Sequence, residues 1–116
     1  IGQAASMGAF LLAGGTAAGT RVYPLTAPDG VAKPYMTYQR ISSNSEHVLS
    51  GSSGLTNTRV QIDVYATTYA EATSIAAQVD ALMSVWSVQN VSISLQDFYE
   101  DQIQLYRISH DYSLWH

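Results

Sequence analysis

The sequence predicts an α+β fold, in which a single domain over residues 1–116 builds a mainly antiparallel, twisted β-sheet with two helices packed on one face. Three observations predict it. Several segments alternate apolar and polar residues as strands do, whereas one long segment repeats its apolar residues at spacings of three and four. The chain is 47% hydrophobic, and a chain of this size buries roughly two-thirds of its unfolded surface in one core.

Residues 1–20 are expected to form an amino-terminal helix and a connector. Met7, Phe10 and Leu11 recur at helical spacing, and a Gly-Gly pair follows them as a helix end. The stretch is apolar enough to resemble a signal peptide, but it lacks a basic leading region and a cleavage site. Its first residue is isoleucine rather than methionine, which is consistent with a start inside a longer gene product.

Residues 21–42 are expected to enter the sheet as strand, turn and strand. A short strand over residues 21–24 stops at a proline. Pro28 and Gly30 then indicate a turn, because proline presets φ and glycine accepts a positive φ. Pro34 opens the second strand, where the first residue need not donate a ladder hydrogen bond. This proline-rich stretch therefore shapes the chain, and no step of it needs a catalytic group.

Residues 43–58 are the longest stretch rich in Ser, Gly and Asn, and they predict a long polar loop. Loops of this length are typically either disordered or functional. The strand that follows, "RVQIDVYA" (residues 59–66), alternates apolar and polar side chains and is expected to bury one face.

A helix from Thr68 to about Ser87 is the clearest local prediction. Thr68 and Glu71 form a capping box, in which the threonine side chain caps the first turn. The apolar residues behind it form one helical face: Ala72, Ile75, Ala76, Val79, Leu82, Met83 and Trp86.

Two strands are expected to complete the sheet. "VSISLQDFYE" (residues 91–100) places Val91, Ile93 and Leu95 on one face. The final segment, residues 103–116, changes its apolar register, which predicts a β-bulge or a strong twist near residues 106–107.

The composition weighs against several functions. Only 12% of residues are charged and the net charge is −4, whereas phosphate-driven nucleic-acid binding needs clustered basic residues. No run approaches the roughly 18 apolar residues of a membrane span. The chain has no cysteine, which excludes disulfides and thiolate metal sites, and its three histidines are scattered at positions 47, 110 and 116.

No catalytic, cofactor-binding or metal site is predicted. "GGTAAGT" lacks the lysine of a phosphate-binding loop. His110 and Asp111 are adjacent in a strand, so they point to opposite faces and do not form a triad. The acidic residues of "DFYED" (97–101) are expected at the solvated corner of a hairpin near Arg107. The eight tyrosines are expected at the edge of the core and at interfaces.

Three phrases together resemble the tail completion (tail terminator) proteins of long non-contractile-tailed phages, related prophages and gene transfer agents. They are "RVYPLTAPDGVAKPYMTYQRISS", "SGSSGLTNTRVQIDVYATTYAEATSIAAQV" and "LYRISHDYSLWH". The resemblance covers residues 21 to about 83 and 97–116, while residues 1–20 and 84–96 match only in general character.

The resemblance implies a structural virion protein without catalysis or cofactor. Such subunits form a ring, typically of six, at the head-proximal end of the tail tube, where the ring stops tube polymerisation and meets the head connector. DNA passes through the lumen without specific binding, and an acidic subunit suits that passage. The implied location is the tail–head interface of a virion assembled in a bacterial cytoplasm. The alternatives are a stopper-like connector ring and, from other classes, a small hydrolase, a ligand-binding domain or a nucleic-acid-binding module.

The expected interaction residues belong to two groups. Charged residues that suit inter-subunit or sheet-face ion pairs are Arg40, Arg59, Asp63 and Arg107. In the polar loop, which is expected to order against a neighbouring subunit or the tail tube, they are His47, Leu49 and Leu55.

Overall fold

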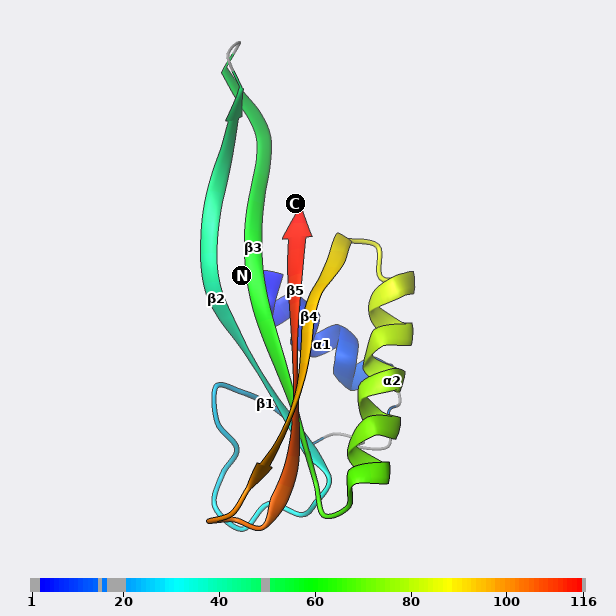
Figure 1. The fold of residues 1–116 in the computed structure, drawn as a ribbon. Coiled ribbons are helices and arrows are strands. Elements are labelled where there is room, and N and C mark those ends of the chain that lie inside the picture. The colour runs from blue at the N-terminus through cyan, green and yellow to red at the C-terminus, as the bar shows by residue number, and fades with distance from the viewer. Residues whose placement is uncertain (1–2, 15, 17–20, 49–50, 116) are drawn as a thin grey trace.

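Figure 1 shows the computed structural model, which describes residues 3–14, 16, 21–48 and 51–115. The elements in chain order are α1 (Gln3–Ala13), β1 (Val22–Pro24), β2 (Tyr35–Val48), β3 (Gly51–Ala66), α2 (Tyr69–Val85), β4 (Gln89–Glu100) and β5 (Leu105–Trp115). The five strands form one sheet in the order β1-β2-β3-β5-β4. The pairs are antiparallel except β1 with β2, which is parallel. The predicted α+β fold with a mainly antiparallel sheet is confirmed.

The α2 helix begins where its capping residue predicts. The Thr68 side chain accepts a hydrogen bond from the backbone N–H of Glu71 at 3.2 Å, which satisfies one of the free donors of the first turn. The helix ends at Val85, two residues before the predicted end, because Trp86 takes an extended backbone. Its buried residues all come from the predicted apolar face: Ala72, Ile75, Ala76, Val79 and Met83.

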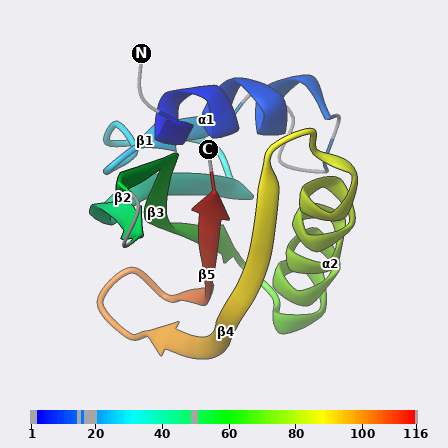
Figure 2. The ribbon, with the colours of Figure 1, turned by 90° about the horizontal axis from the view of Figure 1, so that it is seen from above.

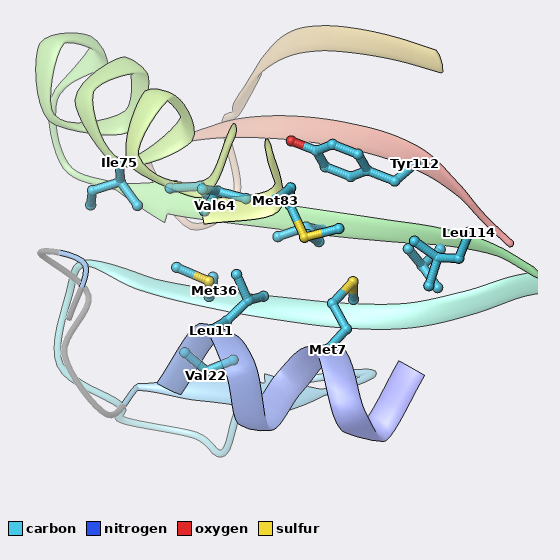
Figure 3. Packing of buried hydrophobic residues seen from close by; sticks show 12 residues of the cluster. Met7, Leu11, Val22, Met36, Val64, Ile75, Met83, Tyr112 and Leu114 are labelled. Carbon is cyan, nitrogen blue, oxygen red and sulfur yellow. The ribbon is translucent and has the colours of Figure 1, made fainter. Parts of the chain in front are cut away.

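Both helices pack on the same face of the sheet (Figure 2), as predicted. Met7 and Leu11 of α1 meet Ile75 and Met83 of α2 within one buried cluster over the strands. Figure 3 shows these side chains converging between the helices and the strands. The strand residues of the cluster are Val22, Met36, Val60, Ile62, Val64, Tyr112 and Leu114.

The structure corrects the prediction of a long polar loop over residues 43–58. These residues extend β2 and β3 into a two-stranded hairpin, paired from Ser43 with Thr58 to Val48 with Gly51. Alternation reveals only strands that bury one face, and a polar hairpin held by backbone hydrogen bonds lacks that signal. Residues 49–50 lie outside the described residues.

The far part of this hairpin is called the hairpin arm and comprises residues 44–48 and 51–56. The last pair between β3 and β5 joins Asn57 to Trp115, so the arm extends beyond the end of β5. In Figure 1 the arm projects away from both helices, and the molecule measures 52 × 26 × 23 Å.

The predicted bulge near residues 106–107 is wrong, because the pairing of β5 is regular there. Ile103 belongs to the preceding turn, where Gln104 has a φ of 55°, and this accounts for the apparent register change. The irregularity lies instead on β4, between Ser92 and Ser94.

That β4 irregularity also corrects the prediction that Val91 and Leu95 share a face. Val91 lies opposite Ser113 on the face away from the helices. Leu95 lies opposite His110 on the helix face, because one extra residue in a strand reverses the alternation.

Candidate functional site

The face of the sheet away from the helices carries a connected set of ion pairs. The Arg107 guanidinium lies 2.8 Å from Glu100 and 3.6 Å from Asp63, and Arg59 lies 3.6 Å from Asp111. Exposed pairs of this kind contribute at most about 1 kcal/mol each. Their effect here is to neutralise these charges within the subunit.

Three predicted interaction residues, Arg59, Asp63 and Arg107, therefore lie on this face of the sheet, called the open face. They form ion pairs within the sheet, which is one of the two kinds of ion pair expected for them. Asp63 is buried, and Gln61 also donates to its carboxylate. Arg107 in addition covers the ring of Phe98 at 4.4 Å, a distance typical of a cation–π contact. The expected pairing of Arg107 with the acidic "DFYED" segment is confirmed at Glu100.

The other predicted interaction residues lie along β2 and the hairpin arm. Arg40 is exposed on β2 and has no ion-pair partner among the described residues. The backbones of His47 and Leu55 belong to the two strands of the arm, and Leu49 lies outside the described residues. The structure does not bring these residues to the open-face ion pairs.

A hydrogen-bond chain through the buried His110 and Tyr112 side chains ties β4, β5 and α2 together. The Tyr112 hydroxyl donates to Asp80 on α2 at 3.0 Å, so it accepts from Nδ1–H of His110 at 3.1 Å. Nε2 of His110 is then free to accept from the Ser92 hydroxyl of β4 at 2.8 Å. Asp111 points to the opposite face, as predicted, and pairs there with Arg59.

This chain of hydrogen bonds lies beside a pocket of about 360 Å³ between α2 and β4, lined in part by Tyr69, Leu95 and Asp97. Tyr69 also donates a 2.5 Å hydrogen bond to Asp97 across it. A serine beside a histidine is the beginning of a nucleophilic site. However, His110 is buried, and its other nitrogen meets a phenol instead of the carboxylate that orients a catalytic base. The arrangement is better suited to holding β4 in place.

His110 makes the stability of the fold depend on pH. Burial lowers the pKa of His110 below its ordinary value of 6.5, although Asp80 and Asp111 oppose the shift. The unfolded histidine is protonated as the pH falls below about 6.5, while the folded one stays neutral. The stability from neutral His110 is therefore complete above that pH and is lost as the pH falls through the lower folded pKa.

We expect the urea midpoint of the wild type to fall between about pH 8 and about pH 5 more steeply than that of a His110→Gln variant. Glutamine keeps hydrogen-bonding capacity but does not titrate. The urea midpoint of the variant at high pH therefore gives the effect of the substitution apart from protonation, and the change toward low pH gives the effect of protonating His110. Equal slopes for the two proteins would contradict the assignment.

Neither a metal site nor a membrane-spanning helix is found in the described part of the chain. No three His, Asp or Glu side chains among these residues are grouped so as to hold a metal ion. None of the helices described has the length and hydropathy to cross a bilayer.

The sequence did not point to β4 as an interaction surface. Its alternation predicted a strand with Val91, Ile93 and Leu95 on one face, yet five of its apolar residues are exposed: Val91, Ile93, Leu95, Phe98 and Tyr99. Alternation is the same in a covered strand and in an exposed one, so no local signal identified this surface.

Comparisons with known proteins agree with this geometry. The family model described as "Tail completion protein gp17" matches residues 9–116. Among solved structures, the chain is similar to a chain from the virion of a native gene transfer agent particle, with a TM-score of 0.66 and 16% sequence identity. That match covers 96% of this chain and 84% of the other, and at this identity it shows the fold alone. No curated protein matches the sequence significantly.

Proposed function

Since the chain belongs to the tail completion protein gp17 family and is a phage tail structural protein, we propose that it forms a ring of six copies at the head-proximal end of the tail tube. There the ring ends tube polymerisation and joins the tail to the head connector. The family match over residues 9–116 is the observation that carries this proposal, and the shape of the subunit supports it.

The hairpin arm supports a contact outside the subunit. Among the described residues its backbone pairs only within the hairpin, beyond the last pair of β3 with β5. An ordered two-stranded hairpin alone is marginal in water, and a binding partner supplies the missing stabilisation. We assign the arm to the tail tube, with His47, Leu49 and Leu55 as its contact residues.

The charge of the subunit suits a channel through which DNA moves. The chain carries nine acidic and five basic residues, and two of the basic ones, Arg59 and Arg107, are engaged in ion pairs. A ring of such subunits repels phosphate, so DNA passes through the lumen without being held. The proposed location is accordingly the tail–head interface of a virion assembled in the bacterial cytoplasm, and the proposed partners are the tube protein and the connector.

The proposal predicts the mass and the activity of the purified protein. Native mass spectrometry is expected to give six times the subunit mass of 12.6 kDa, either alone or on the ends of tail tubes. Tube protein polymerised with it should stop at shorter lengths in electron micrographs than tube protein alone. A monomer that ignores tubes would contradict the proposal. A ring that binds the connector but not tubes would instead identify a stopper-like protein.

A further inference from the structure

We propose that the ring closes by strand pairing between two free edges of the sheet, with β4 of one copy lying against β2 of the next copy. This inference rests on the proposed ring and names the surfaces that build it. In the strand order β1-β2-β3-β5-β4, β4 forms one edge, and on the other side the short β1 leaves most of β2 as the edge. A contact between these two edges is heterologous, which is the type that generates closed rings.

The first edge, β4, has features that sheets normally avoid at an edge. It is the outermost strand and pairs only with β5 along its twelve residues. Its five exposed apolar side chains are 39–56% exposed and point to both faces of the sheet. Edge strands of monomers are typically short or protected by lysine and proline. β4 contains neither lysine nor proline, and of the features that protect an edge strand from pairing it has a bulge at Ile93.

The second edge belongs to β2. The parallel pairing with β1 covers only Met36 to Tyr38, and the Leu25 N–H adds a bond to the Tyr38 carbonyl. From Gln39 to Val48 the outer edge of β2 has no strand partner among the described residues. At about 3.3 Å per residue this free edge is about 33 Å long, and β4 is about 40 Å long. The two edges therefore match in length.

The charges on the two sides are of opposite sign. No lysine or arginine occurs from residue 60 to residue 106, the part of the chain that contains α2 and β4. The acidic residues on these two elements and the turn after them are Glu71, Asp80, Asp97, Glu100 and Asp101. Outside the open-face ion pairs, β1, β2 and their flanks carry the basic residues Arg21, Lys33 and Arg40 against the acidic Asp29 and Glu46, a net charge of +1. Opposite charges favour β4 against β2 and disfavour β4 against β4. A second copy of the chain is thus the partner that fits.

Two isoleucines mark the free edges and provide matched sites for a test. Ile41 and Ile93 each lie at a register shift on its own edge strand, and each is 45% exposed. Ile103 is 51% exposed but lies in the turn between β4 and β5, away from the register shifts. The same substitutions at Ile103 therefore control for loss of an exposed isoleucine.

Each variant places a charge in the apolar part of the contact. Ile41→Glu opposes the acidic β4 strand, and Ile93→Lys opposes the strand that carries Arg40. Each is expected to raise the concentration needed for ring assembly at least tenfold, whereas Ile103→Glu and Ile103→Lys assemble like the wild type. Native mass spectrometry measures the assembly, and thermal unfolding checks that all four variants remain folded.

A mixture of the two edge variants tests the head-to-tail arrangement directly. Ile41→Glu retains an intact β4 edge, Ile93→Lys retains an intact β2 edge, and the two altered edges carry charges of opposite sign. Their equimolar mixture should therefore recover assembly, with the two variants alternating. Normal rings from either variant alone, or a mixture that stays monomeric, would overturn the edge pairing. If the wild type itself forms no ring, alone or with tubes, the proposed function fails instead, so the two failures are distinguishable.

Discussion

Shortening the hairpin arm is expected to weaken binding to the tail tube roughly 100-fold, which corresponds to about 2.7 kcal/mol, and thereby to lower the yield of joined head–tail particles. The change replaces residues 45–56 by Asn-Gly, the preferred two-residue hairpin turn, between Asn44 and Asn57. Asn44 and Asn57 are opposite one another in the β2–β3 ladder, so the new turn closes a regular hairpin.

The fold should survive this shortening, because the base of the arm is anchored separately. The Asn57 side chain donates to the Ser113 hydroxyl at 2.5 Å and to the Leu114 carbonyl at 3.1 Å. The removed residues pair only within the arm, whereas the core lies between the helices and the rest of the sheet. The thermal unfolding midpoint is therefore expected to change by only a few degrees.

The measurement is the number of complete particles released by cells in which the shortened gene replaces the wild-type gene. Native mass spectrometry of the same variant shows whether rings still form. Rings that form but do not join tails would assign the arm to the tube contact. Normal joining by the shortened protein would exclude the arm from assembly.

The largest loss of stability is expected for Ile62→Ala, at about 3 kcal/mol. Ile62 is fully buried on the helix face of β3, within the cluster that unites both helices with the sheet. Truncating its side chain loses the transfer free energy of three carbons. It also leaves a cavity, because the two helices are packed against the same cluster and cannot move in to fill the space.

Urea denaturation measures the loss, and Ile103→Ala is the matched control. Ile103 is exposed in the turn before β5, so its truncation should change the free energy of unfolding by less than about 0.5 kcal/mol. A loss below about 1 kcal/mol for Ile62→Ala would contradict the packing of both helices on this face.

The sequence predicted the ion-pair residues of the candidate site only in part. Arg59, Asp63 and Arg107 were expected in ion pairs, and the structure places them in pairs on one sheet face. Arg40 was expected in the same role, but among the described residues it stays unpaired, beside the free edge of β2. Whether a charge is satisfied within the subunit depends on which strands are neighbours, and spacing along the chain does not reveal this.

The sequence by itself determined the elements that obey a local rule. Thr68 and Glu71 place the start of α2, because capping involves residues three apart. The alternation of residues 59–66 identifies β3, because successive side chains of a strand point to opposite faces. These rules also sufficed for the α+β class. The resemblance to the tail completion family rested instead on three sequence phrases, and the family match over residues 9–116 confirms it.

Only the tertiary structure decided which surfaces remain free. Residues 43–58 resemble a loop in composition, yet the described ones, 43–48 and 51–58, form strands because the two halves of the hairpin pair through their backbones. The apolar residues of β4 alternate as in a buried strand, yet they stay exposed because β4 is last in the sheet order and carries a bulge. Pairing and edge position depend on contacts between distant segments, so local periodicity cannot specify them.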